Sequence, residues 1–483
     1  MSYVTHAFRF LAVPAAIACA LLVGYLAFLG PGYFLLGLAA VALVALFALN
    51  SRFALYGLLV FTFFENWLPV VPGMPSALKL MGVLVIGSWA VRRLTDRDAA
   101  PLTGPVEVVM MLFLGVALGS LAVATDAMVG VSFFLRYAMF FGLAVVVADH
   151  VRTLRDAYHI VLVVVIAGAA AAAGGLWMFF FGGTFRVQGP LVDPNDLAFA
   201  LSMAAALGFY IVMVNRGLAR GLLLGALSFI TAGLVGTLSR GAAAGVVFGA
   251  AWGVMLGRVR ARYLFSVLVA AVITVAVVYT VDPERIALAV EMKQGWGGVN
   301  VAERFDRWRI ALDMMADNPV LGVGVGNYGV LYRAYGGTEL LGNESGEAHN
   351  VTHNMYLEVG AEMGVLGLLA FLAILGTALW MAIHLVTSDQ AARASREKSG
   401  AIFDASSDEA LARPVAAGVS TALVTLCVAG LFLTEQYFAP LWVVIGLISG
   451  LRRIGRRWGE TGQVRVDEEP TGTEFAAPLA RRV

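Results

Sequence analysis

The stretch that decides the fold class is YHIVLVVVIAGAAAAAGGLWMFFF, residues 158–181. It contains no Asp, Glu, Lys or Arg, and at about 1.5 Å of helix rise per residue it can cross the roughly 30 Å hydrocarbon core of a bilayer. Runs of this kind recur along the chain. Of the 483 residues, 60% are hydrophobic and 13% are charged, whereas a soluble domain carries about 25% charged residues. The sequence therefore predicts an all-α polytopic membrane protein.

The recurring apolar runs predict about 14 transmembrane helices, within a range of about 12 to 14. Their residue ranges are 9–29, 33–50, 53–71, 78–91, 104–124, 129–149, 158–181, 196–214, 219–238, 241–257, 263–281, 353–386, 414–433 and 438–452. We expect a single membrane domain. Its parts are N-terminal transmembrane helices in 1–281, a large external loop with short helices in 282–352, C-terminal transmembrane helices in 353–459 and a flexible tail in 460–483.

The distribution of Lys and Arg predicts the orientation of these helices. One set of alternate loops carries basic residues throughout: 50–52, 92–97, 152–156, 215–220, 258–262, 390–413 and the C-terminal tail. In the other set, the loops 30–32, 72–77, 125–128 and 434–437 carry none. Since basic loops stay in the cytoplasm, both termini are expected there.

Three segments on the predicted outer side do carry arginine: 182–195, 239–240 and 282–352. Basic residues on the disfavoured side, at a membrane surface, indicate a function. The third segment is also far longer than an ordinary connection, and such loops are functional or disordered. Its aromatic residues favour an ordered loop.

The first of these segments contains Arg186 and the helix start Asp193–Pro194. Asp is a preferred N-cap residue and Pro is favoured at the first helical position, so these two residues predict a helix beginning near 194. That explanation does not extend to Arg186. Its guanidinium either binds a phosphate as a bidentate donor or reaches toward lipid headgroups, and the residues leave both interpretations open.

Arg240 interrupts two apolar runs that otherwise nearly touch. A charge within hydrocarbon costs roughly 3 kcal/mol or more, so Arg240 is expected at the interface or in a polar cavity. Ser239 before it is a candidate helix cap. The small residues of 241–245 predict close helix packing. For Arg240 itself, an anion-binding role is favoured.

The long external segment contains Arg304, Arg307 and Trp308, which share an amphipathic pattern and predict a helix along the membrane surface. Asp317–Asn318–Pro319 is expected to end it. The following GVGVGNY resembles a nucleotide-binding glycine motif in letters only, because no strand–turn–helix unit surrounds it.

His349 and His353 are the histidines of the predicted outer side. His353 begins a predicted transmembrane helix, where the helix dipole disfavours the imidazolium and leaves the neutral imidazole that a general base needs. Two alternatives are a simple helix cap and a metal pair with Glu347 or Glu358. Glu358 and Glu362, one helical turn apart, are expected to face a polar cavity or to pair with an arginine such as Arg240 or Arg304.

The composition of the chain also bears on its possible partners and on its redox chemistry. A net charge of +1 gives no indication of a nucleic-acid partner. Cys19 and Cys427 both lie in apolar runs, which favours buried thiols over a disulfide.

The outer arginines could stabilise a departing diphosphate without a divalent metal, while the histidine removes a proton from the attacking hydroxyl. No Asp-rich metal motif is present in the sequence.

Several motifs together resemble the O-antigen ligase and polymerase superfamily over roughly residues 180–450. They are Arg186-x2-Gly189-x3-Asp193-Pro194-Asn195, Ser239-Arg240-Gly241, Arg304-x3-Trp308, Asn318-Pro319-x2-Gly322-x-Gly324-x-Gly326-Asn327 and His353-Asn354-x-Tyr356-Leu357-x3-Gly360-x3-Gly364-x2-Gly367. The histidine segment with its glycine-punctuated helix is the most specific of them.

The resemblance implies a GT-C-like fold and a metal-independent, inverting glycosyltransferase without a cofactor, at the periplasmic face of the bacterial inner membrane. The implied donor is an undecaprenyl-diphosphate-linked glycan, and the implied acceptor is a glycan, a lipid A core or a protein. By position, His353 would activate the acceptor hydroxyl, and Arg186, Arg240 and Arg304 would hold the donor diphosphate. His349, Asn354 and Glu358 are candidates for a supporting role.

Two further functions remain open beside a glycan ligase. A polymerase that joins lipid-linked repeat units would use the same chemistry with a different acceptor. A membrane transporter would also explain many helices and buried charge, but it predicts charged residues near mid-membrane and interrupted helix pairs. Here the charges concentrate at one face, which favours the enzyme. The sugar, the acceptor and the oligomeric state do not follow from the sequence.

Overall fold

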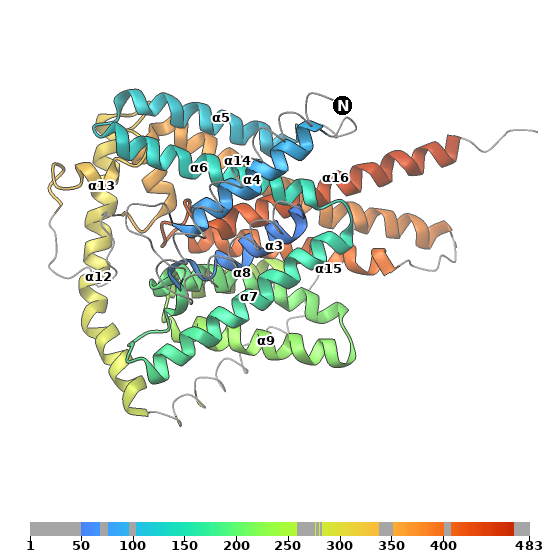
Figure 1. The fold of residues 1–483 in the computed structure, drawn as a ribbon, viewed down its shortest axis with the longest axis horizontal. Helices are drawn as coiled ribbons and strands as arrows, with labels where there is room; N and C mark the ends of the chain where they lie inside the picture. The colour runs from blue at the N-terminus through green and yellow to red at the C-terminus, as the bar shows by residue number, and fades with distance from the viewer. Residues whose placement is uncertain are drawn as a thin grey trace, which may run out of the picture.

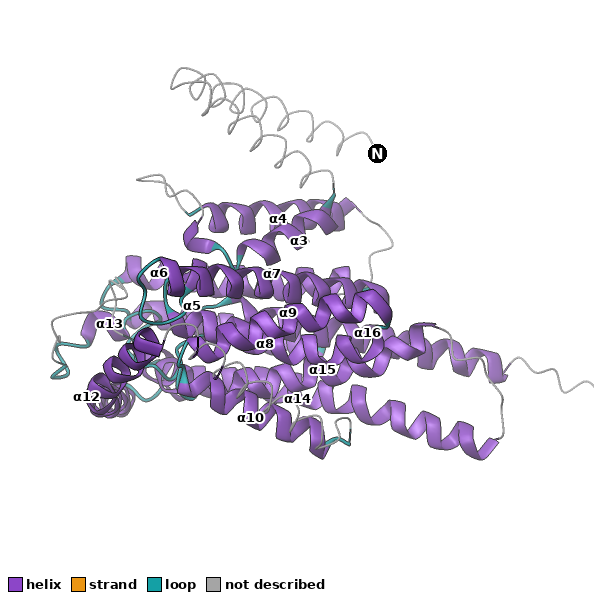
Figure 2. Cartoon of the chain, turned by 90° about the horizontal axis from the view of Figure 1, so that it is seen from below, coloured by secondary structure: helices purple, strands orange, loops and turns teal. Residues whose placement is uncertain are grey.

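The computed structural model describes residues 50–67, 76–95, 103–257, 276, 280, 283–337, 351–399 and 407–467, and within them every regular element is helical (Figures 1 and 2). The all-α prediction is confirmed. The longer helices are α3 (Ser51–Phe61), α4 (Ala77–Thr95), α5 (Pro105–Ser120), α6 (Ala127–His150), α7 (Leu154–Phe181), α8 (Pro194–Val214), α9 (Gly217–Gly236), α10 (Arg240–Met255), α12 (Pro283–Asp317), α14 (Met355–Ser399), α15 (Ser407–Ala429) and α16 (Ala439–Asp467). Short turns of helix form η1 (Glu65–Trp67), η2 (Leu121–Val123), η3 (Gly189–Leu191) and α13 (Tyr328–Leu331).

Six helices in the described part of the chain are long and apolar enough to cross a membrane: Pro105–Val123, Ala127–His150, Leu154–Phe181, Pro194–Val214, Gly217–Gly236 and Met355–Thr387. Shorter apolar helices are Ser51–Phe61, Arg240–Met255 and Arg413–Ala429. The predicted span 9–29 lies outside the described residues, as do the spans 33–50 and 263–281 apart from residues 50, 276 and 280. The chain is therefore a membrane protein by its helices, while the number of about 14 spans stays a prediction.

Polar residues at the helix starts explain where the helices begin. Asp126 caps α6, since its carboxylate accepts from the N–H groups of the first turn. Thr153 begins α7 with a capping box, in which side chain and backbone of Thr153 and Asp156 bond reciprocally. The predicted cap at Asp193 is confirmed, because its Oδ1 accepts from the Asn195 N–H at the start of α8.

The helix α8 lies at the centre of the bundle and packs against α7, α9, α10 and α15. The packing of α10 on α15 depends on small residues, as the sequence predicts. A Cβ at Gly245 would lie 2.4 Å from the Thr425 carbonyl oxygen, and one at Gly249 would lie 2.0 Å from the Thr425 hydroxyl. Glycine alone permits this approach. The contact brings the N-terminus of α10, with Arg240, beside the loop after α15.

The long helix α12 lies across one end of the bundle (Figure 1). The prediction of short helices in 282–352 is wrong for this part, because residues 283–317 form one continuous helix. Its end is as predicted: Asp317 is the last helical residue before Asn318–Pro319. Proline removes a backbone donor and disfavours a helical residue before it, so a helix ends there.

Two spans differ from the predicted ranges near this end. The helix predicted at 53–71 ends at Phe61, and a turn follows in which Asn66 Nδ2 donates to the Leu191 carbonyl oxygen (2.8 Å). The helix predicted to begin at His353 begins at Met355 instead.

At the opposite end, ion pairs join loops that the sequence assigned to one common side. Arg93 pairs with Asp149. Arg453 Nη2 lies 2.6 Å from Glu107 Oε1 and so ties α16 to α5. The bundle thus has two distinct ends, with the predicted outer loops meeting at α12.

Candidate functional site

His353 lies in a tight turn between the segment 351–352 and α14. Its backbone φ is +53°, a left-handed conformation that few non-glycine residues adopt. Asn354 caps α14, with its Oδ1 accepting from Tyr356 N–H (3.0 Å) and Leu357 N–H (3.1 Å). The Asn354 N–H donates to Thr352 Oγ1 (3.0 Å). The strained backbone is held because the residues on both sides of His353 are fixed.

Glu358 supports the same turn from within α14. Its Oε2 accepts from the Thr352 N–H at 2.9 Å and lies 3.1 Å from Thr352 Oγ1. Its Oε1 accepts from Gln436 Nε2 at 3.1 Å. Glu358 thus fixes the residue before His353. Thr352 and Gln436 were not identified from the sequence, because neither residue type has a distinctive spacing.

Of the two alternatives for Glu358 and Glu362, the polar cavity fits Glu358, which lines the cavity described below, while no ion pair of either carboxylate with an arginine is found among the described residues. Glu362 Oε2 accepts from the Tyr437 hydroxyl at 2.6 Å, and its carboxylate also accepts from backbone N–H groups of Gly326 and Tyr328. Both carboxylates are buried and satisfied by neutral donors.

Side chains of α12 bond to the segment before His353 and to the loop after α15. Arg307 Nη1 donates to the Val351 carbonyl oxygen at 2.8 Å, and Trp308 Nε1 donates to the Thr352 carbonyl oxygen at 3.1 Å. Arg304 Nη1 donates to the Phe432 carbonyl oxygen at 3.0 Å. These bonds fix α12 to the segment before α14 and to the loop after α15. Each guanidinium keeps further N–H donors beyond the one used here.

Arg186 joins two other outer loops. Its Nε donates to the Thr237 carbonyl oxygen at 2.8 Å, and its Nη2 donates to Asn195 Oδ1 at 3.3 Å. The interpretation of Arg186 as a residue that reaches out to lipid headgroups does not fit this partly buried position. Arg240 begins α10 and is exposed. Its neighbour Ser239 occupies the cap position without a side-chain capping bond.

The electrostatics show that the four arginines form one cluster. Burial lowers the pKa of Arg304, and the charges of Arg307 and Arg240 lower it further. Burial also lowers the pKa of Arg186, and Arg304 adds to that effect. Asp193 is the carboxylate that opposes both shifts. Among the described residues, no carboxylate lies within ion-pairing distance of any of the four. We call Arg186, Arg240, Arg304 and Arg307 the arginine cluster.

His353 belongs beside this cluster. Loss of water around the ring lowers its pKa to about 3, and the charges of Arg304 and Arg307 contribute to the lowering. The imidazole is therefore neutral at neutral pH. Within the described residues, no hydrogen bond to its ring is found, so a ring nitrogen is available to accept a proton.

The glycine-rich loop 319–326 packs against a break in α14. At Gly364 the backbone φ is +63° and ψ is −163°, which interrupts the helical hydrogen bonds. Val323 N–H donates to the Ala361 carbonyl oxygen at 2.9 Å. Gly324 N–H donates to the Glu362 carbonyl oxygen at 2.9 Å. The loop thereby satisfies carbonyl groups that the break leaves without helical partners.

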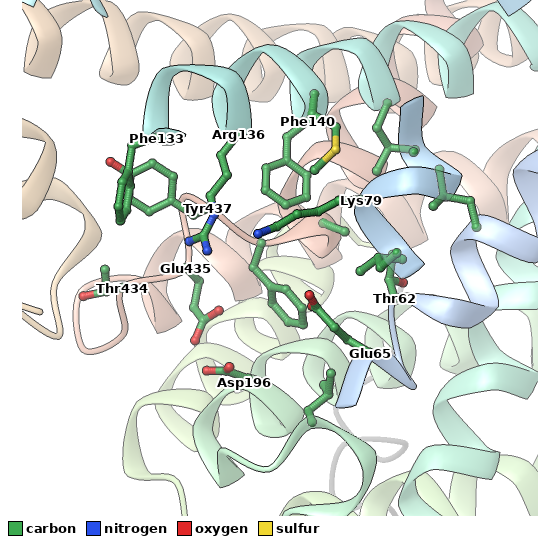
Figure 3. Close-up of a pocket in the computed structure, with 18 of the residues that line it drawn as sticks. Thr62, Glu65, Lys79, Phe133, Arg136, Phe140, Asp196, Thr434, Glu435 and Tyr437 are labelled. Atoms are coloured by element: carbon green, nitrogen blue, oxygen red, sulfur yellow. The ribbon is translucent and has the colours of Figure 1, made fainter. Parts of the chain in front are cut away.

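A cavity of about 370 Å³ lies on the other side of the segment 351–352 (Figure 3). Its wall includes Val351 and Glu358, together with the charged residues Glu65, Lys79, Arg136, Asp196 and Glu435. The sequence analysis missed these five charged residues. The available signals were Glu65, Lys79 and Arg136, which are charges inside the predicted spans 53–71, 78–91 and 129–149, because intramembrane charges face a polar interior.

The structure thus brings together Arg186, Arg240, Arg304, His353, Asn354 and Glu358. His349 lies outside the described residues. Among those residues, no group of three or more His, Cys, Asp or Glu side chains is placed to hold a metal ion. Chemically, the arrangement offers clustered guanidinium donors for a phosphate-type anion beside a neutral imidazole that can accept a proton.

Comparison with known protein families gives one match. The family model described as O-antigen ligase matches residues 223–372. The match includes Arg240, Arg304, His353 and Glu358, while Arg186 precedes it. No curated protein matches the chain. The resemblance drawn from the motifs is confirmed over residues 223–372, which match the O-antigen ligase family model.

Proposed function

We propose that this protein is a glycosyltransferase that moves a glycan from an undecaprenyl-diphosphate carrier to an acceptor hydroxyl at the periplasmic face of the inner membrane. The observation that carries the proposal is the position of the His353 turn, whose preceding residues accept hydrogen bonds from Arg307 and Trp308 of α12, beside the arginine cluster. Family membership supports a ligase or polymerase activity in general. The carrier, the acceptor and the side of the membrane are part of the proposal.

In the proposed reaction, a ring nitrogen of His353 accepts the proton of the acceptor hydroxyl. The acceptor oxygen forms a bond to the anomeric carbon of the donor sugar. The bond from that carbon to the diphosphate oxygen breaks, and the diphosphate leaves with the electron pair. Attack opposite to the leaving group inverts the anomeric configuration. The arginine cluster stabilises the charge on the leaving diphosphate by several hydrogen bonds, without a divalent metal.

The same cluster couples donor binding to the strength of the base. In the free protein, Arg304 and Arg307 lower the pKa of His353. Burial is the larger cause of that lowering, so a bound diphosphate offsets only the contribution of the two arginines and raises the pKa part of the way. His353 is therefore a better proton acceptor when the donor is present. This order favours transfer to the acceptor after the donor has bound.

Asn354 and Glu358 are positioning residues in this scheme. They fix the turn that contains His353 through Thr352 and the first N–H groups of α14. Replacing Glu358 by Gln keeps its shape but weakens the two bonds to Thr352. We expect that change to lower kcat without changing the apparent affinity for the donor.

The test compares wild type with His353→Ala and His384→Ala in membranes containing equal amounts of protein. His384 lies on α14, where its Nδ1 bonds to the Trp380 carbonyl oxygen, so it is a matched control away from the site. The donor is an undecaprenyl-diphosphate glycan, and each assay is run with and without EDTA. We expect His353→Ala to lower transfer by about 100-fold or more. Wild type and His384→Ala should stay active, with EDTA present or absent.

Full activity of His353→Ala would refute the assigned base. Loss of wild-type activity in EDTA, restored by a divalent cation, would refute the metal-independent scheme. Product size separates the two acceptor classes, because a ligase makes one product of defined length and a polymerase makes a ladder. If wild type transfers no glycan to any acceptor tried, the transferase proposal fails.

A further inference from the structure

The lining of the cavity beside the site is polar near α12 and apolar farther along the helices. The polar residues come from helix ends near α12: Glu65 after α3, Lys79 in the first turn of α4, Asp196 in the first turn of α8, and Glu435 in the loop before α16. Farther along the helices, its lining is apolar and includes Ile86, Met139 and Leu143. In Figure 3, the side chains of Lys79, Arg136 and Glu65 point into the cavity from three different elements.

The charge of this wall is mixed, unlike that of the arginine cluster. Its lining contains four carboxyl groups, on Glu65, Asp196, Glu358 and Glu435, and two cations, on Lys79 and Arg136. A diphosphate is therefore attracted more strongly to the arginine cluster than to this wall. The two regions therefore select different parts of the substrates.

The chemistry of the lining fits a sugar. Carboxylates accept strong hydrogen bonds from hydroxyl groups, while Lys79 and Arg136 can donate to ring and hydroxyl oxygens. Phe133, Phe140 and Tyr437 supply aromatic surfaces for the apolar face of a sugar ring. A volume of about 370 Å³ lies within the roughly 300–1,000 Å³ of small-molecule pockets.

The segment 351–353 separates the cavity from the arginine cluster. The Val351 carbonyl oxygen accepts from Arg307, and Val351 also lines the cavity. Thr434 lines the cavity too, and its hydroxyl lies 3.5 Å from that of Thr352. His353 follows directly in the chain. The cavity thus lies within two residues of the proposed base along the chain.

We infer that this cavity binds the sugar residues of the acceptor, with Glu65, Lys79 and Arg136 as specificity-determining contacts. The inference rests on the proposed transferase function and adds where the acceptor binds and which chemistry recognises it.

The experiment uses Glu65→Gln and Lys79→Gln, which change the cavity from two different helices, and Glu284→Gln as the matched control. Glu284 is exposed at the start of α12 and lines no part of this cavity. Initial rates are measured at varied acceptor with saturating donor, and at varied donor with saturating acceptor. Thermal melting of each purified variant in nanodiscs identifies a variant that fails to fold.

We expect both cavity variants to raise the acceptor KM by about tenfold or more, because each loses a charge-assisted hydrogen bond. Their donor KM should stay within about twofold of wild type, and Glu284→Gln should change neither constant. A rise in donor KM with an unchanged acceptor KM would assign the cavity to the donor and overturn the inference. Unchanged values of both constants in folded variants would overturn it as well.

A binding measurement separates this inference from the proposed function. Fluorescent lipid A–core glycolipid, or in a second arm the free repeat-unit oligosaccharide, is titrated into His353→Ala protein in nanodiscs. Weaker binding of the probe to the double variant His353→Ala/Glu65→Gln than to His353→Ala supports acceptor binding in the cavity, even if wild type shows no transfer. Equal binding with and without Glu65→Gln, or no binding of either probe, overturns it. If wild type transfers glycan and Glu65→Gln has the same acceptor KM as wild type, the transferase proposal stands. In that case only the assignment of the cavity to the acceptor is wrong.

Discussion

At the scale of single residues, His353 combines a left-handed backbone with a ring that has lost most of its hydration. A left-handed conformation costs a non-glycine residue about 1–3 kcal/mol. Five hydrogen bonds stabilise this backbone conformation on either side of His353 in the chain, and they involve Thr352, Asn354 and Glu358. The ring itself is left free of hydrogen bonds within the described residues. The strain is thus concentrated in the backbone of the residue that we propose as the base.

The pKa of His353 predicts the pH dependence of transfer. The base must be neutral, so activity is lost as the pH falls through the pKa of the ring. In the free protein that pKa is lowered to about 3, and kcat/KM reports the free protein. We therefore expect kcat/KM to stay constant well below pH 6. The bound diphosphate raises the pKa, so the acid limb of kcat should lie at higher pH than that of kcat/KM.

Initial rates between about pH 4 and 8 test this, since the unperturbed pKa of a histidine is about 6.5. Over this range we expect kcat to fall toward acid pH while kcat/KM for the donor stays constant. An acid limb in kcat/KM at the same pH as in kcat, or at higher pH, contradicts the coupling. The residual activity of His353→Ala serves as the control and should lack the histidine limb.

At the scale of elements, the site depends on a break in a transmembrane helix. The break at Gly364 lets the glycine-rich loop bond to carbonyl groups of α14. A Cβ at Gly364 would lie 2.5 Å from the Val320 carbonyl carbon, and its φ of +63° is unfavourable for an L side chain. The loop in turn connects α12, with Arg304, to α14, with the His353 turn at its start. The two helices are thus held in one relative position.

Gly364→Ala is expected to destabilise the protein by about 3 kcal/mol or more, through the left-handed backbone and the overlap with Val320. Transfer activity should fall as well, because α12 and the His353 turn lose their common support. Gly376→Ala on the same helix is the control, since a Cβ there meets nothing within 4 Å. Thermal melting in nanodiscs compares the two variants. Similar midpoints would show that the break is not required.

At the scale of the whole molecule, the bundle places two different kinds of charge at its two ends. At the α12 end, the arginine cluster has no ion-paired carboxylate among the described residues. At the other end, Arg93 and Arg453 are paired with Asp149 and Glu107. Uncompensated arginines attract an anionic substrate, whereas paired ones connect helices. The unpaired set lies at the end that we predict to be periplasmic.

Single-cysteine labelling tests that orientation. Met128 is exposed at the start of α6, near the α12 end, and Leu218 is exposed at the start of α9, at the other end. With Cys19 and Cys427 replaced by Ala, we expect Met128→Cys to react with a membrane-impermeant maleimide in intact spheroplasts. Leu218→Cys should react only after permeabilisation. The reverse pattern would place the candidate site in the cytoplasm and exclude a periplasmic transfer.

The sequence by itself determined features that depend on neighbours along the chain. The apolar runs predicted the helices, because crossing a bilayer requires length and apolarity that are both local properties. The start of α8 at Asp193–Pro194 and the end of α12 before Pro319 followed from the backbone chemistry of those residues. The family motifs also lay within short stretches, and the family resemblance was confirmed over residues 223–372.

Only the tertiary structure decided which side chains meet. Arg186, Arg240 and Arg304 come from three separate loops or helices, and their approach to His353 depends on how those elements pack. The partners of Glu358 proved to be Thr352 and Gln436 instead of an arginine. The cavity joins Glu65 to Arg136 across the bundle. Hydropathy and helix capping depend on residues that are adjacent in the chain. These contacts depend on packing between helices that are distant in the chain, so no local sequence pattern predicts them.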